Sequence, residues 1–202
     1  MTVPRLLGLV VLLAPLVPVV RAQAYQYPLT SEAIREAYFL GVSPQSTQSH
    51  FYDSYSYSFH MRDTDLPGSV ITIETPFLQV AERASKTPNY DAQDAVKEFL
   101  GKPAVFRVYA DVYYNPRRAD ATSDDAKVTL TVMQNDKKIA PDSTDTWGLT
   151  TFHDAGTGAV RVGEHVQFEF KAENIAASPL TIKVSDPDND NAKATFDLAT
   201  IR

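Results

Sequence analysis

Three aspartates at alternate positions near the end of the chain form the most suggestive pattern for a chemical site. Asp186, Asp188 and Asp190 match the first three ligand positions of a twelve-residue calcium loop, and Asp197 falls at its twelfth position. Carboxylate oxygens are the ligands that Ca²⁺ prefers in proteins. The pattern departs from that loop because Asn191 stands where glycine belongs and no helix is expected on either side. An acidic turn between two strands is the simpler interpretation, and calcium at these four aspartates is the alternative.

Aromatic side chains are the second group that could bind a ligand. The segment from Phe51 to Phe59 alternates aromatic residues with serines, which is typical of a strand with one heavy aromatic face. Flat aromatic rings stack on pyranose rings, so a sugar-binding platform is one interpretation, and burial in a hydrophobic core is the other. The aromatics that we expect to lie outward and to be open to a ligand are Tyr52, Tyr109, Tyr113 and Trp147.

Other catalytic or metal-binding patterns are weak. The four histidines, His50, His60, His153 and His165, have no metal-ligand spacing, and a surface or capping role explains each of them. The chain contains no cysteine, no nucleophile elbow of the GxSxG type and no glycine-rich phosphate loop. Carboxylates occur in pairs, Asp63 with Asp65 and Asp124 with Asp125. A glycosidase needs two carboxylates about 5–10 Å apart in a cleft, whereas polar loops explain these pairs more simply.

Helices are expected only in the first half of the mature chain. Thr30 is a good N-cap for a helix over 31–40, and Gly41 follows in the position where glycine often ends a helix. Thr75-Pro76 begins a second helix, which ends near Lys86. A third begins at Asp91 and stops at Gly101. Between the first two, the sequence predicts a polar loop over 43–50 and a β-hairpin from strands at 51–59 and 69–74.

The stretch from residue 103 to 114 organises the rest of the chain. Phe106, Val108, Ala110 and Val112 alternate with Arg107, Tyr109, Asp111 and Tyr113, which indicates a strand with one buried face. Further short strands separated by turns follow, with a break at Gly163-Glu164. Strands that recur at a spacing of roughly ten residues are typical of a β-sandwich. We therefore expect a mainly β chain with N-terminal helices (α+β), in which 103–202 form an immunoglobulin-like antiparallel β-sandwich.

The first 24 residues are expected to form a signal peptide. Arg5 precedes an apolar run over 6–20, and small residues allow cleavage after Ala22 or Ala24. Removal of this segment leaves 17 basic residues against 25 acidic ones, a net charge of −8. Such a charge disfavours nucleic acid and anionic membrane surfaces as partners. No second apolar run exists, so we expect a secreted or periplasmic protein without a membrane span in its mature form.

Three short segments carry a resemblance to known proteins. The segment from Tyr27 to Gly41, the tripeptide Thr75-Pro76-Phe77 and the closing Phe196-Asp197-Leu198 resemble an uncharacterised group of bacterial secreted proteins. The resemblance implies a bacterial, envelope location. It implies no activity, cofactor or site residue.

Two hypotheses of function follow. The first is a non-catalytic secreted or periplasmic module that binds an envelope protein or a carbohydrate or has a structural role. Its domains would be a signal peptide (1–24), a helical and hairpin part (25–102) and the sandwich (103–202). The second is a carboxylate-dependent hydrolase, for example one acting on glycans. No cofactor is expected apart from calcium at the aspartates described above.

Overall fold

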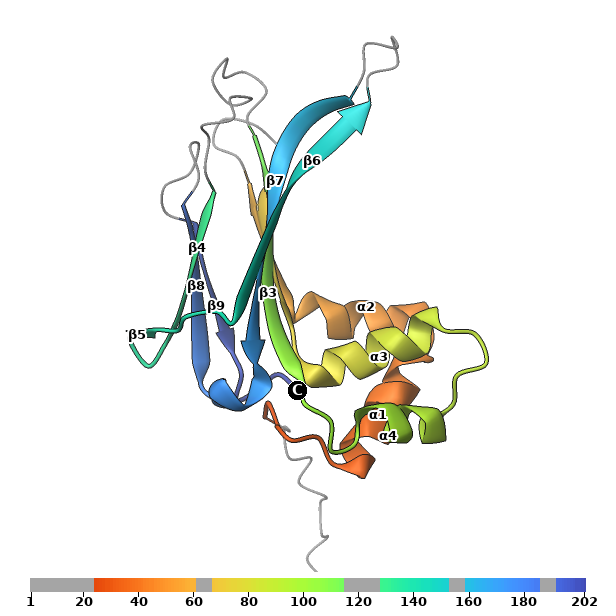
Figure 1. Cartoon of the computed structure of the whole chain (residues 1–202). Helices are drawn as coiled ribbons and strands as arrows, with labels where there is room; N and C mark the ends of the chain where they lie inside the picture. The colour runs from red at the N-terminus through yellow and green to blue at the C-terminus, as the bar shows by residue number, and fades with distance from the viewer. Residues whose placement is uncertain (1–23, 61–66, 115–127, 153–158, 186–191) are drawn as a thin grey trace, which may run out of the picture.

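The structure, a computed structural model, describes residues 24–60, 67–114, 128–152, 159–185 and 192–202. The signal peptide expected over 1–24 lies outside these ranges except for its last residue. The described residues form two antiparallel sheets that pack face to face, with helices against the far side of one of them (Figure 1). The prediction of a mainly β chain with N-terminal helices is confirmed.

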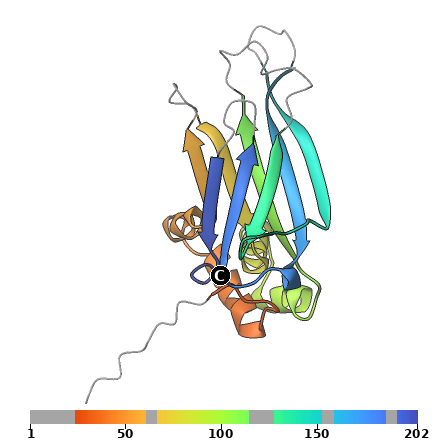
Figure 2. The same ribbon diagram turned by 90° about the vertical axis from the view of Figure 1, so that its left-hand side faces the viewer.

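The larger sheet has five strands. In spatial order they are β1 (Ser56–His60), β2 (Pro67–Glu74), β3 (Val105–Tyr113), β7 (Ala159–Lys171) and β6 (Ser143–Phe152). The smaller sheet has the order β5 (Lys137–Lys138), β4 (Thr129–Gln134), β8 (Pro179–Ser185) and β9 (Ala192–Asp197). Figure 2 shows the smaller sheet in front of the larger one. The predicted hairpin therefore extends the larger sheet.

Strand β3 lies in the middle of the five-stranded sheet, and it has the one buried face that its sequence pattern predicts. Phe106, Val108, Ala110 and Val112 are buried, and the residues between them are half-buried. The buried face packs on the smaller sheet, to which Leu180 and other residues of β8 contribute. Burial of each large apolar side chain contributes about 1.5–3 kcal/mol, so a core built by β2, β3, β4, β7, β8 and β9 can hold the fold without disulfides.

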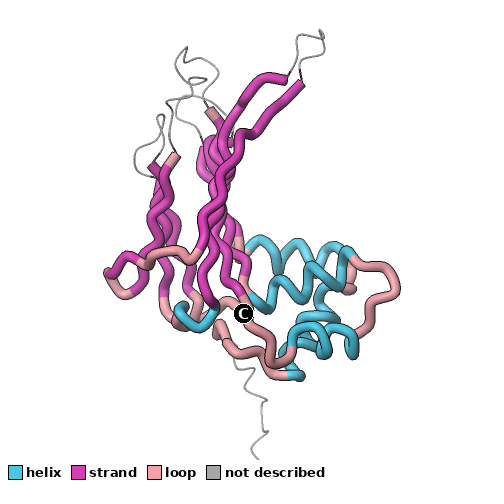
Figure 3. Tube along the Cα trace, viewed as in Figure 1, coloured by secondary structure: helices cyan, strands magenta, loops and turns pink. Residues whose placement is uncertain are grey.

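Four helices lie on the side of the larger sheet that faces away from the smaller one (Figure 3). They are α1 (Ser31–Gly41), α2 (Gln45–Asp53), α3 (Pro76–Lys86) and α4 (Ala92–Phe99). The predicted caps are confirmed, because the side chains of Thr30, Thr75 and Asp91 accept backbone N–H groups of the first turns. A second, smaller core joins α1, α3 and α4 around Ile34, Phe77 and Ala95.

Gly41 has a different role from the expected one. It is the last residue of α1, and the left-handed conformation that would favour glycine is found at Gly101 after α4, with φ +68°. A Cβ atom at Gly41 would collide with the backbone carbonyl of Ala81 on α3. Glycine at this position therefore permits close contact between two helices.

The segment from Ser43 to Phe59 corrects two further predictions. Residues 45–53 form helix α2 instead of a polar loop and the start of a strand, and β1 begins only at Ser56. Phe51 packs between Tyr55 and Phe77, with ring centroids 4.9 Å and 6.0 Å apart. This contact with α3 places Phe51 on a helix, although its sequence neighbours alternate as in a strand.

Strand β7 does not break at Gly163-Glu164. It runs as one strand from Ala159 to Lys171 and pairs with β3 as far as Gly163, which lies opposite Tyr113. Beside this glycine the pairing of β7 with β6 shifts register, because Leu149 lies opposite Gly163 and Thr150 lies opposite Arg161. A Cβ atom at Gly163 would collide with the carbonyl oxygen of Val112. The glycine that suggested a break is needed for a close approach of two strands inside the sheet.

Candidate functional site

Three of the four aromatics predicted to bind a ligand share one face of the molecule. In antiparallel strands, residues directly opposite each other point to the same side of the sheet. The register places Val70, Asp111, His165 and Trp147 in one row across β2, β3, β7 and β6. Tyr109 and Tyr113 alternate with Asp111 on β3 and belong to the same side. We call this outer surface of the five-stranded sheet the platform face.

Trp147 and His165 form the centre of the platform face. Trp147 is the only tryptophan of the chain, and it is 48% exposed. It lies parallel to the imidazole of His165, with ring centroids 3.8 Å apart and an interplanar angle of 18°. Tyr109 stacks on the same imidazole at 5.6 Å and 25°. Three rings on three strands are thus held against one another, and the outermost remains open to solvent.

Asp111 fixes the orientation of His165. Its Oδ1 atom lies 2.6 Å from Nδ1 of His165, and the His165 side chain is only 12% exposed. A carboxylate only accepts hydrogen bonds, so the Nδ1–H group of the imidazole is the donor. The other ring nitrogen, Nε2, is buried and has no hydrogen-bond partner among the described residues. The pair resembles an acid–base dyad in composition, but its second nitrogen is closed to a substrate.

An ion-pair cluster borders the platform face on the helix side. Arg107 Nε donates to Glu169 at 2.7 Å, and its Nη1 donates to Glu74 at 3.1 Å. Burial raises the pKa of Glu74, and the bond to Arg107 acts in the opposite direction. The bond from Arg107 holds the pKa of Glu169 below its usual value. Ser143 donates a further hydrogen bond to Glu169 at 3.1 Å.

Tyr52, the fourth predicted aromatic, comes from helix α2. Burial raises its pKa, and the negative charge of Glu82 on α3 adds to the effect. Burial likewise raises the pKa of Tyr109 to about 12, with contributions from Glu74 and Glu82. Tyr52 itself is half-buried and packs against the main hydrophobic core.

Strand β6, which carries Trp147, and its neighbour β7 bend toward the helices. Figure 1 shows β6 and β7 extending beyond the other strands and curving toward the side on which α2 and α3 lie. Trp147 occupies β6, which is an edge strand, so among the described residues no further strand pairs with β6 on its outer side. The platform face is therefore curved, with a bare aromatic ring on one strand and polar side chains beside it.

Of the four predicted calcium ligands, only Asp197 lies among the described residues. Asp186, Asp188 and Asp190 lie outside them. Asp197 ends β9, and its Oδ1 atom accepts a hydrogen bond from the N–H group of Ala199 at 3.1 Å. Five residues of strand, about 16 Å, separate it from Ala192, where the described part of β9 begins. Calcium binding stays a prediction.

Of the other candidate residues from the sequence, some lie within the described ranges and some lie outside them. His50 lies on α2 and His60 ends β1, and both are exposed. His153 and the carboxylate pairs Asp63/Asp65 and Asp124/Asp125 lie outside the described residues. Within the described ranges no group of three or more His, Asp or Glu side chains could hold a metal ion.

Sequence reasoning missed the roles of His165 and Asp111. Both stand at outward positions of alternating strands, where solvent exposure is the default expectation. The signal that could have found them is the pairing of β3 with β7, which sets an acid opposite a histidine. That register depends on residues 54 apart in the chain and leaves no local trace.

Comparisons with protein-family models, with curated proteins and with solved structures found no match for this chain. No helix in the described ranges has the length and apolar character needed to cross a bilayer.

Proposed function

We propose that this protein is a non-catalytic binding module of the bacterial envelope, and that its ligand is a carbohydrate that stacks on Trp147. The observation that carries the proposal is an exposed indole held flat on His165 at 3.8 Å. Stacking on a ring that is already fixed costs little conformational entropy, because the side chain does not have to be ordered by the ligand. Tryptophan is among the residues that are enriched at binding surfaces, because its ring is apolar and its N–H group is polar.

Polar side chains beside Trp147 suit the hydroxyl groups of a sugar. Asp145 precedes Trp147 by two residues on the same side of β6, is exposed, and lies opposite Gln167 of β7. A carboxylate accepts hydrogen bonds from hydroxyl groups, and an amide both accepts and donates them. A flat apolar ring flanked by such groups matches a pyranose, which has apolar faces and a polar rim.

The geometry favours binding over hydrolysis. The two carboxylates with opposite pKa shifts, Glu74 and Glu169, both bond to Arg107, so their oxygens neutralise a cation. The imidazole of His165 has one nitrogen on Asp111 and the other buried. A general base must reach the proton that it removes, and neither arrangement offers such access.

We further propose that the two sheets form an immunoglobulin-like sandwich. The strand order supports it: β2-β3-β7-β6 corresponds to the A-B-E-D order of such domains, and β4-β8-β9 to C-F-G. In this assignment β1 is an added strand beside A, and β5 is an added short strand beside C. The helices then form an insertion around the start of the domain.

The proposed envelope location rests on the N-terminal sequence. The apolar run after Arg5 and the small residues at Ala22 and Ala24 support export. Glycans and envelope proteins are the ligands available there, and we propose the glycan because a flat indole can stack on a pyranose ring.

Titration with oligosaccharides tests the carbohydrate proposal. Because the chain has one tryptophan, its fluorescence reports directly on the site. We expect chitotetraose or cellotetraose to shift the emission of Trp147, with a dissociation constant that calorimetry confirms. Trp147→Ala should abolish binding in the calorimeter.

Tyr57→Ala is the matched control, because Tyr57 is another aromatic with a half-exposed side chain, 50%, on the opposite side of the sheet. It should bind as the wild type does. Equal loss in both variants, or no heat and no emission change with either sugar and with solubilised peptidoglycan fragments, would overturn the proposal. Capture of an envelope protein that depends on Trp147, with no sugar binding, would favour a protein ligand instead.

A further inference from the structure

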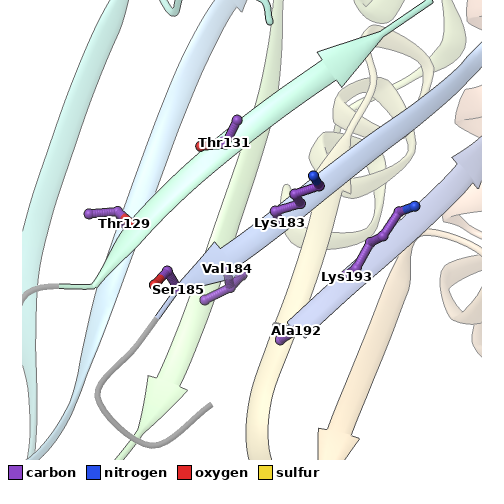
Figure 4. A pocket seen from close by; sticks show the side chains of 7 residues that line it. All are labelled: Thr129, Thr131, Lys183, Val184, Ser185, Ala192 and Lys193. Atoms are coloured by element: carbon purple, nitrogen blue, oxygen red, sulfur yellow. The ribbon is translucent and has the colours of Figure 1, made fainter. Parts of the chain in front are cut away.

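The outer surface of the four-stranded sheet is covered by none of the helices that the structure describes. The helices lie against the other sheet, on the opposite side of the molecule (Figure 1). Thr129 and Thr131 of β4, Lys183 and Ser185 of β8 and Lys193 of β9 point outward from this sheet (Figure 4). We call this surface the lysine face. It carries hydroxyl and ammonium groups and, at its centre, no carboxylate among the described residues.

Lys183 and Lys193 are directly opposite each other on β8 and β9. Like charges in directly opposed positions of an antiparallel pair are unfavourable. Neither lysine forms an ion pair within the described part of the chain, in contrast to Lys86, Lys97 and Arg107. Two lysines serve solubility equally well at offset positions. The direct pairing concentrates positive charge at one point of a protein that is acidic as a whole.

A depression of about 430 Å³ lies at this point. It is lined by both lysines, by the hydroxyl-bearing Thr129, Thr131 and Ser185, and by Val184 and Ala192 (Figure 4). A second depression of about 300 Å³ continues from it along the sheet and shares both lysines. Asp136 lines the second depression but not the first. The first depression therefore combines two cations with three hydroxyl donors.

We propose that the first depression is an oxyanion site, which takes a carboxylate, sulfate or phosphate group between Lys183 and Lys193. Ammonium groups bind such anions as point charges, and hydroxyl groups of Thr131 and Ser185 donate to the remaining oxygens. A bound anion also removes the repulsion between the two lysines. The continuation into the second depression accommodates a linear ligand, so an acidic oligosaccharide that bears the oxyanion fits the site as well as the free ion.

NMR titration of ¹⁵N-labelled full-length protein tests this proposal, with inorganic phosphate, sulfate and tetragalacturonate as probes. We expect saturable shifts of the amide signals of Thr131, Lys183 and Lys193, weakened by added NaCl. The double variant Lys183→Gln/Lys193→Gln should lose at least 90% of the affinity. Its melting temperature without the anion should equal or exceed that of the wild type, because the repulsion is gone.

Lys137→Gln/Lys138→Gln is the matched control. Lys137 and Lys138 are the exposed residues of β5, so these substitutions remove the same charge from the same sheet. It should leave the affinity within twofold. Equal weakening in both double variants, or shifts that do not saturate, would show a general charge effect and overturn the proposal. Tighter binding of tetragalacturonate than of phosphate and sulfate assigns the site to an acidic glycan, whereas equal or weaker binding assigns it to the free oxyanion.

Discussion

Asp111 and His165 face each other across β3 and β7, with Oδ1 of the acid 2.6 Å from Nδ1 of the imidazole. This bond fixes the plane of a ring on which both Trp147 and Tyr109 stack. The aspartate therefore does not need to take part in chemistry to matter for function. It determines the orientation of an exposed indole two strands away.

His165→Ala should loosen Trp147 without unfolding the protein. Loss of the aromatic stack costs about 1 kcal/mol of unfolding free energy, and the freed indole gains motion. We expect lower fluorescence anisotropy of Trp147 and at least tenfold weaker sugar binding. His60→Ala, at an exposed position of β1, is the control and should change neither quantity. Unchanged anisotropy in His165→Ala would show that the stack does not hold the indole.

Arg107→Ala should destabilise the fold more than its outward position suggests. The substitution leaves Glu74, whose side chain is 14% exposed, without its cation. An unpaired, largely buried carboxylate costs about 1–3 kcal/mol, which urea denaturation at neutral pH can measure. Arg83→Ala is the comparison, because Arg83 and Glu98 form an exposed pair worth about 0.5 kcal/mol. Equal losses in both variants would contradict the role given to Glu74.

Glu169→Gln should cost most stability near neutral pH. The bond from Arg107 lowers the pKa of Glu169 below 4.5, so its stabilising contribution is present above that pH and is lost as the pH falls through the folded-state pKa. The difference in unfolding free energy between wild type and variant should therefore shrink on acidification from pH 7 to pH 3. A difference that stays constant over this range would exclude the ion pair as its cause.

Glu74→Gln should respond to pH in the opposite direction. Burial raises the pKa of Glu74 above 4.5, so the folded state holds its proton more tightly than the unfolded state does. The contribution of Glu74 to stability is thus largest below pH 4.5 and declines as the pH rises through the folded-state pKa. Parallel denaturation series of both glutamine variants between pH 3 and pH 7 would show the two slopes, and slopes of the same sign would contradict the assignment.

Gly41→Ala should destabilise the helical part. Alanine favours a helix over glycine by about 1 kcal/mol, but the new methyl group would collide with the backbone of Ala81. A forced backbone shift costs about 1–3 kcal/mol, so the loss should outweigh the gain in thermal denaturation. Gly148→Ala is the control, because its methyl group would meet the flexible side chain of Arg161 at 3.1 Å. A Gly41→Ala variant that melts above the wild type would show that α1 and α3 are not in close contact.

The features that depend on near neighbours can be recognised in the amino-acid sequence alone. The caps at Thr30, Thr75 and Asp91 need only side chains within three residues of the helix they begin. The alternation along β3 needs only the twofold repeat of a strand, and the turn at Asn135-Asp136 only residues that tolerate positive φ. These signals are local, so they can be recognised without a fold.

Features that depend on contacts between distant segments become visible only in the folded chain. Phe51 lies on a helix because it packs against Phe77. Gly163 lies within a strand because only a residue without a Cβ atom fits beside the backbone of Val112. Likewise, Asp111, His165 and Trp147 meet because the register of three strands places them in one row. Register is set by the core on the opposite side of the sheet, and the residues of the site carry no information about it.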